Sequence, residues 1–511
     1  MSVKPGEYQH YIPQFLLKEF ANPFTCPSRE KTGKTKCKCK HEKGKYPGDP
    51  VLNCVNLTAT PFQHEVHSVK RIFGLTQMYD DKTRPTTAEQ RRIETKFSKM
   101  ESQAATILRR AMKALEKGEA GIAMTRIDRD LLRKFLFLLK YRGIGFHNRF
   151  DHASADEYCS NDRELILHYM RQKGFKMPLD VWFHNLEAIM DVEMDPNRRW
   201  MEELPTRMFP MDARWFVHHA QSYYMAFCTP SDPSQEFVIT DNCFNVFEGN
   251  NTFVRDQSTG EIIQGAHAGY HEFNPVSPRL IIILRSFILP NPEEDKDPKI
   301  AERRDKWRWQ AFGQLYGTDT GSAFANLPIH KARNSYSEVI NGSIYSNRDF
   351  DGRYRPGDKF TFHFFQINSY YVNTINYMLL DNVYPFTTIA FRNKEAFFET
   401  IDSYIGAPCR LHKIVGGHET ARQLLFLHAL EDFAKDMGSV RKLVYRYMES
   451  PPTVNGESFS RTHIEFQLGL EEILEKGSGR SKKTFESFLQ MYAKLGEITS
   501  KNPSRVALTM T

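Results

Sequence analysis

Apolar side chains recur at helical spacing over much of the first 230 residues. Residues 10–20, HYIPQFLLKEF, place four apolar side chains on one helix face, so we expect an ordered core element near the start. Two longer patterns cover 87–118 and 125–143, and each ends at a glycine. Thr87, with Gln90 three residues later, is the predicted N-cap of the first. Shorter helical patterns cover 161–173, 180–191 and 212–227.

The pattern changes after residue 235, where short apolar runs are separated by turn residues. Residues 236–249 predict two strands joined by a turn at Asp241-Asn242, and residues 272–286 predict a proline-bounded turn leading into a buried strand. Helical periodicity returns over 365–380, 394–405 and 418–448. The predicted fold class is α+β, predominantly α-helical, with a small and mostly antiparallel β portion in the first module.

The length of 511 residues exceeds what one hydrophobic core usually serves, so we expect two or three parts. We predict a core module over 1–290, a charged linker and irregular segment over 291–365, and a helical C-terminal portion over 366–511. The last 60 residues have the pattern of two helices separated by the polar stretch 475–483.

Five blocks of sequence together resemble one family. The blocks are HYIPQFLLKEF (10–20), IETKFSKME (93–101), RKFLFLLKYRGIGFHNRF (133–150), FVITDN with FEG (237–249) and FNPVSPRLIIILRS (273–286). They resemble the domain of unknown function 4238 family over about residues 8–290, and residues 365–382 look like the extension of its longer members. The resemblance implies no established activity, cofactor or substrate. Where the family often has Asn-Pro after a Ser/Thr-Asp turn, this chain has Asn242-Cys243, which argues against a function needing a rigid proline there.

Paired glutamates are the first candidates for acid–base chemistry. Glu94 and Glu101 are seven residues apart, so two helical turns put them on one face, roughly 10–11 Å from each other. Arg133 and Lys140 repeat this spacing on the next helix. If the two helices pack antiparallel, the four charges meet across one seam. We favour a structural ion-pair ladder there, and the alternative is an acid–base or ligand-binding groove.

Residues elsewhere in the sequence could complete such a groove. Asp241 lies at a strand end, where a carboxylate either makes a turn or serves a site. His10 lies in an apolar segment, where a histidine is more often a hydrogen-bonded core residue than a catalyst. Arg142, Arg149 and Arg285 could hold a phosphate or carboxylate, although burial by pairing is the usual alternative. The candidate catalytic set is Glu94, Glu101, Arg142, Asp241 and His10.

A cysteine cluster near the start offers candidate metal ligands. Its members are Cys26, Cys37, Cys39, His41 and Cys54. Thiolates and imidazole are zinc ligands, and a zinc ion could order a polar loop, but structural sites usually space their cysteine pairs by two to four residues. Here the close pair is Cys-x-Cys, so we keep zinc as the weaker reading and a solvated loop as the stronger.

Charge and missing motifs narrow the function classes. Most of the net charge of +7 comes from residues 29–45, where eight Lys/Arg face two glutamates. This Lys-rich loop, within 25–50, could contact an anionic partner, and nucleic acid is not favoured because the rest of the chain is nearly neutral. The sequence has no Walker loop, no dinucleotide glycine fingerprint and no GxSxG elbow, so no nucleotide cofactor is expected.

No apolar run approaches the roughly 20 residues that cross a bilayer, and the sparse cysteines favour a reducing compartment, so we expect a cytoplasmic protein with nuclear placement open. Two functions remain. The first is an enzyme, such as a hydrolase, with a polar pocket in the core module. The second is a non-catalytic binding or scaffold protein that uses the C-terminal helices and the Lys-rich loop. The expected partner is an unknown small-molecule or protein ligand.

Overall fold

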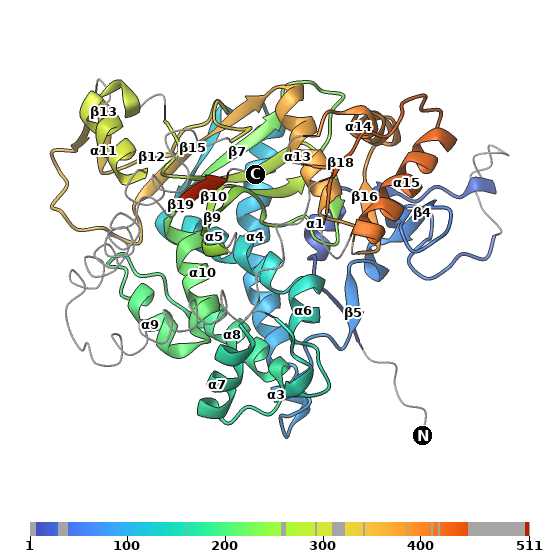
Figure 1. Ribbon diagram of the computed structural model, residues 1–511, viewed down its shortest axis with the longest axis horizontal. Coiled ribbons are helices and arrows are strands. Elements are labelled where there is room, and N and C mark those ends of the chain that lie inside the picture. Colours follow the sequence, from blue (N-terminus) through green and yellow to red (C-terminus); the bar gives the residue numbers. More distant parts are fainter. Residues whose placement is uncertain are drawn as a thin grey trace.

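The computed structural model of the chain (Figure 1) contains an eight-stranded sheet and a five-stranded sheet with helices packed around them. It describes residues 7–28, 39–160, 162–256, 262–291, 294–308, 322–340, 343–384, 386–409, 412–416, 420–447 and 506–509. The α-helices of this part are α1 (Gln14–Glu19), α3 (Thr87–Gln90), α4 (Arg92–Glu116), α5 (Arg126–Tyr141), α6 (Ile144–Phe150), α7 (Arg163–Lys173), α8 (Pro178–Asp191), α9 (Trp200–Arg207), α10 (Pro210–Gln221), α11 (Pro298–Arg308), α13 (Ser369–Asp381), α14 (Lys394–Gly406) and α15 (Thr420–Asp436).

The strands of the described residues form several sheets. They are β1 (Tyr8–His10), β2 (Asn22–Pro23), β3 (Pro50–Asn56), β4 (Gln63–Ser68), β5 (Gly74–Thr76), β6 (Gly121–Thr125), β7 (Tyr223–Pro230), β8 (Ile239–Thr240), β9 (Val246–Asp256), β10 (Ile262–Ser277), β11 (Leu280–Ser286), β12 (Arg333–Asn334), β13 (Ser337–Ile340), β14 (Ser343–Ser346), β15 (Lys359–Ile367), β16 (Thr388–Phe391), β17 (Ile414–Val415), β18 (Arg446–Tyr447) and β19 (Val506–Thr509).

The largest sheet has eight strands. Its order is β12-β15-β7-β11-β10-β9-β19, with β6 pairing β15 beside this path. β15 runs parallel to β7, and the other pairs are antiparallel. β7 and β11 are buried at every position, as expected for central strands covered on both faces. The expectation of a predominantly helical protein with a small β portion is therefore wrong.

One physical reason for this error is visible at β7. Residues 212–227 read as a single helical pattern, but the structure ends α10 at Gln221 and begins β7 at Tyr223. A short, continuous apolar run carries no period that separates a buried strand from a buried helix. The turn and buried strand expected over 272–286 are confirmed, because Pro278 and Arg279 form a turn between β10 and the buried strand β11. Pro275 itself lies inside β10, opposite Ile281 of β11 and beside a register shift.

A second sheet has five strands and draws on distant parts of the chain. Its order is β2-β3-β16-β8, and β4 pairs with β3. β16 thus lies between β3 and β8, just as β15 joins β7 in the large sheet. Both sheets are completed by residues beyond 290. Each sheet thus contains strands from both sides of residue 290, and the segment 291–365 contains α11, β12 to β14 and most of β15.

Helices α6 to α10 gather below the large sheet, and α13 to α15 lie with the smaller one (Figure 1). α5 runs through the core and buries its apolar centre, Phe135 to Leu139, as its sequence predicts. Thr125 caps it by accepting a bond from the Asp128 amide at 3.2 Å. The pattern over 87–118 forms two helices, and the capping box uses Thr86 with Glu89 rather than Thr87 with Gln90.

The start of the chain is folded as predicted. Ile12, Leu16 and Phe20 are buried in the core, and α1 covers residues within the 10–20 segment. Among the described residues, no helix combines the length and apolar character needed to cross a bilayer. The two helices predicted for the last 60 residues fall mainly outside the described part of the chain.

Candidate functional site: an arginine pocket

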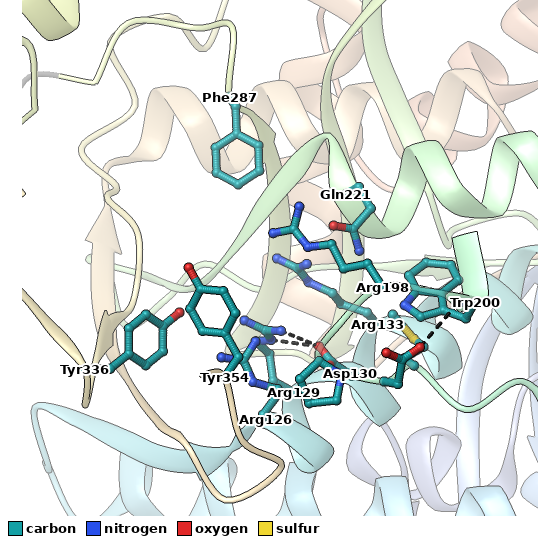
Figure 2. Close-up of a pocket in the computed structure, with 13 residues that line it drawn as sticks. Arg126, Arg129, Asp130, Arg133, Arg198, Trp200, Gln221, Phe287, Tyr336 and Tyr354 are labelled. Carbon is teal, nitrogen blue, oxygen red and sulfur yellow. Dashed lines mark hydrogen bonds and ion pairs between the residues drawn. The ribbon is translucent and has the colours of Figure 1, made fainter. Parts of the chain in front are cut away.

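A cavity of about 160 Å³ lies where α5 meets the end of α10 (Figure 2). The polar face of α5 supplies Arg126, Arg129, Asp130 and Arg133 to its wall, because these positions repeat at helical spacing. The loop between α8 and α9 adds Arg198, and aromatic side chains on the other sides enclose the space. We call this cavity the arginine pocket. Four of its 13 lining residues are arginines.

Two of the four arginines are neutralised by carboxylates. Arg129 pairs with Asp130, with 2.7 Å between Nη2 and Oδ1. Arg126 donates to Asp358 Oδ2 at 2.7 Å, and its guanidinium lies 5.1 Å from the ring centre of Tyr354. This second pair ties α5 to the segment that leads into β15. These two guanidinium groups are therefore part of the wall.

Arg133 and Arg198 differ, because no carboxylate in the described residues forms an ion pair with either. Arg133 donates to two backbone carbonyls, Ala220 O at 2.6 Å and Tyr223 O at 3.0 Å. The side chain of Arg198 makes no hydrogen bond within the described residues and is exposed. Figure 2 shows both guanidinium groups pointing into the same space, beside Gln221.

The charge around Arg133 is incompletely balanced. The pKa of Arg133 is lowered to about 9, chiefly by burial and also by the neighbouring cations Arg129 and Arg198, while Asp130 opposes the shift. A guanidinium has five N–H donors, and the described residues use two of those of Arg133. A bound anion would supply the missing negative charge.

The loop that carries Arg198 is held in place by its own hydrogen bonds. Asp195 accepts from the amides of Asn197 at 2.8 Å and Trp200 at 3.3 Å. Arg198 itself has φ of +62°, a left-handed conformation that a residue with a side chain rarely adopts. Such conformations persist where the surroundings fix them and are frequent at binding sites.

The residues predicted as catalytic do come together, but in a buried network of their own. Arg142 is almost fully buried and donates to His10 O and Tyr11 O, each at 2.9 Å, and to Glu101 Oε1 at 2.7 Å. Glu94 is half-buried nearby; burial raises the pKa of its carboxyl and Arg142 opposes the rise. The His10 ring donates through Nε2 to Val69 O at 3.0 Å, and burial lowers its pKa, which keeps the ring neutral.

Asp241 belongs to the same region and joins three segments. One oxygen accepts a short bond from the hydroxyl of Tyr11. The other accepts from the amides of Thr387 at 3.0 Å and Thr388 at 2.7 Å. The carboxylate thus fastens the start of the chain and the entry to β16 onto the end of β8. Each of its oxygens already has a donor, so the contacts of Asp241 are those of a structural residue.

The predicted ladder between Glu94, Glu101, Arg133 and Lys140 is not formed. Arg133 faces α10 instead, and Lys140 donates to Asn242 Oδ1 at 2.6 Å. Arg142, the C-cap residue of α5, is the basic residue that pairs with Glu101 instead. Spacing along α5 correctly put Arg133 and Lys140 near one face, but it could not show which neighbouring element that face contacts.

The other arginines named as candidates are also engaged. Arg149 pairs with Asp212 and Asp162. Arg285 donates to the carbonyls of Phe324, Pro290 and Ala325, each at 2.8 Å. These contacts fasten loops to the core, which is the pairing that a buried guanidinium needs.

The cysteine cluster receives no support as a zinc site within the described residues. Cys26 and Cys54 are buried, and Cys39 is exposed and donates to Ser28 Oγ at 3.2 Å. Burial raises the pKa of the Cys54 thiol well above its usual range, which disfavours the thiolate that binds metals. His41 contacts aromatic rings, and Cys37 lies outside the described residues. In that described part, no three His, Cys, Asp or Glu side chains are placed to hold a metal ion.

Sequence reasoning named Arg133 but missed the pocket. The usable signal was the series Arg126, Arg129 and Arg133, which puts three cations on the polar face of one predicted helix. Arg198 gave no signal, because it lies in a loop whose position depends on the packing of α8 and α9.

Comparison with known proteins identifies a family but no activity. No curated protein and no solved structure matches the chain. The family model described as a protein of unknown function (DUF4238) matches residues 8–395, which extends the resemblance about 100 residues past the predicted limit of 290. Residues 365–382, expected to be an extension of longer members, lie within this match. The chain belongs to the domain of unknown function 4238 family.

Proposed function

We propose that this protein binds a small anionic ligand in the arginine pocket. The observation that carries the proposal is the convergence of Arg133 and Arg198 on one cavity, with no carboxylate ion pair to either in the described residues. Unbalanced cations in a partly enclosed site attract anions more strongly than exposed cations do. Arginine also binds oxyanions with paired hydrogen bonds.

The size of the cavity limits the ligand. Its volume of about 160 Å³ compares with the roughly 150 Å³ of a cavity that encloses benzene, and typical drug-sized sites begin near 300 Å³. The pocket therefore suits one anionic group with few additional atoms, and a larger ligand would have to extend out of its mouth.

Binding is favoured over hydrolysis at this site. The described lining contains no histidine, cysteine or serine, and its carboxylates Asp130 and Asp195 are already hydrogen-bonded. A hydrolase acting through Glu94, Glu101, Arg142, Asp241 and His10 remains untested. The hydrogen bonds among those residues favour a structural role for the set.

Calorimetric titration with inorganic phosphate at constant ionic strength tests the proposal. Wild-type protein should bind one phosphate per chain and unfold at a higher temperature in its presence; at 100 times the Kd the gain is about 2.7 kcal/mol. Gln221→Glu places a carboxylate beside Arg133 and Arg198 and should weaken binding at least tenfold. Because the new charge meets cations, this variant should fold as well as the wild type.

The matched control is Gln103→Glu, the same change of charge at an exposed position of α4 that does not line the pocket. Phosphate affinity should not change in this variant. Equal phosphate affinity in wild type and Gln221→Glu would contradict the proposed site.

A further inference from the structure

We infer that the arginine pocket selects a phosphate group with three free oxygens, either free phosphate or the phosphoryl group of a monoester, and that Arg198 sets this preference. The inference rests on the proposed function and specifies its ligand. It also separates the pocket from nucleic-acid binding, since a backbone phosphodiester offers two free oxygens and one negative charge.

The number of converging arginines is the first argument. A carboxylate has two oxygens, which one guanidinium can bind in a fork. Arg133 and Arg198 approach the cavity from different elements, the helix α5 and the loop before α9. Two forks from two directions present up to four N–H donors, and three oxygens accept these with less crowding than two. A tetrahedral phosphate monoester supplies three, and a diester or a carboxylate supplies two.

Charge is the second argument, and it counts the charged residues of the pocket lining together with Asp358. Arg129 is balanced by Asp130, and Arg126 by Asp358. Arg133 and Arg198 remain, and Asp195 is the negative group that opposes a bound anion. Its carboxylate accepts from the amide of Asn197 in the loop and from that of Trp200, the first residue of α9, where the helix dipole favours negative charge. These four arginines and three carboxylates carry a net charge of +1, which attracts a dianion more strongly than a monoanion.

The two arginines differ in the hydrogen bonds that their side chains make, and this difference gives them separate roles. Arg133 also holds the end of α10 through its bonds to Ala220 O and Tyr223 O, so it contributes to the fold. The side chain of Arg198 makes no hydrogen bond or ion pair within the described residues. Its backbone is nevertheless in a strained, left-handed conformation. A side chain that can be removed without disturbing packing, and whose position the loop nevertheless fixes, is suited to ligand recognition.

The experiment compares four probes on the full chain, namely inorganic phosphate, methyl phosphate, dimethyl phosphate and acetate, at pH 8 and constant ionic strength. Phosphate and methyl phosphate should bind at least tenfold more tightly than dimethyl phosphate and acetate. If methyl phosphate binds as tightly as phosphate, the pocket accepts a monoester; if it binds more weakly than phosphate but still tenfold more tightly than dimethyl phosphate, the free ion is the preferred ligand. Both results support the inference.

The Arg198→Gln variant tests the assigned residue. It should lose at least tenfold in affinity for methyl phosphate and less than threefold for acetate, so that the preference largely disappears. The control is Arg199→Gln, which removes the same charge at the adjacent exposed residue outside the pocket lining, and it should keep the wild-type preference.

Three results would overturn the inference, and they differ in what they say of the proposed function. Equal affinity for all four probes would leave anion binding intact and refute the selectivity. An equal loss in Arg198→Gln and Arg199→Gln would show that long-range charge, not contact, sets the preference. If none of the four probes binds, the proposed function fails as well.

Discussion

Replacing Asp241 by alanine should destabilise the protein strongly without changing the arginine pocket. Asp241 is 7% exposed, and its two oxygens serve the hydroxyl of Tyr11 and the amides of Thr387 and Thr388. Alanine would leave these donors in a buried space without an acceptor. The substitution removes hydrogen bonds that join the chain start, β8 and the entry to β16. None of the residues at this junction lines the arginine pocket.

The expected cost follows from the hydrogen bonds. A buried donor that loses its partner costs about 1–3 kcal/mol, and the two backbone amides cannot turn away. The Tyr11 hydroxyl adds a similar cost if no water reaches it. Burial raises the pKa of Asp241, so removing a desolvated carboxylate returns part of this loss. We expect a net destabilisation of about 3–5 kcal/mol, within the range measured when one partner of a buried polar set is removed.

Urea unfolding followed by tryptophan fluorescence measures the loss, and phosphate titration of the folded fraction measures the pocket. Asp241→Asn keeps one acceptor oxygen and should lose about half as much stability. Tyr11→Phe removes only the short bond and should cost about 1.5–3 kcal/mol. Wild-type stability in Asp241→Ala, together with altered phosphate binding, would refute the structural role argued for this carboxylate.

The cations Arg142 and Lys140 give further predictions. Arg142→Met should cost about 3–5 kcal/mol in urea unfolding, because Glu101 and the carbonyls of residues 10 and 11 lose their partner; Glu101→Gln, at a side chain that is 27% exposed, should cost less than about 1.5 kcal/mol. A similar cost for both would contradict this. Lys140 has its pKa lowered by burial to about 8 from 10.5, so the charged form opposes folding below pH 8 and this penalty fades as pH rises toward 10.5. Wild-type stability should therefore increase relative to Lys140→Met between pH 8 and pH 10.5, and a difference independent of pH would refute the assignment.

Local structure was predictable where the chain alone determines it. α5 was expected because its apolar positions keep a helical period between Thr125 and Gly143. The 10–20 segment was expected for the same reason. Strand β7 was not, because its unbroken apolar run lacks a period. β15 and β16 could not be placed either, since the pairing of a strand with a partner far along the chain leaves no local trace.

The candidate site shows the same division. His10, Glu101 and Arg142 were named from the sequence and do lie together, yet their hydrogen bonds to one another favour a structural role. Only the contacts distinguish Arg142, which is fully paired, from Arg198, which is not. Both are arginines near a helix end, and sequence gives no measure of which one lacks a carboxylate neighbour.

The insertion of β15 beside β7 and of β16 between β3 and β8 has a consequence for how the chain folds. The early strands cannot complete their backbone hydrogen bonds until much later residues are available, so the contact order is high and folding should be slow. An isolated 1–290 fragment would expose the unpaired edges of β7 and β3, which are sites of aggregation. The same edges would act as receptors for the remaining residues. Two separately purified fragments divided near residue 290 should therefore recombine, with β15 and β16 of the second fragment pairing with the exposed strands of the first.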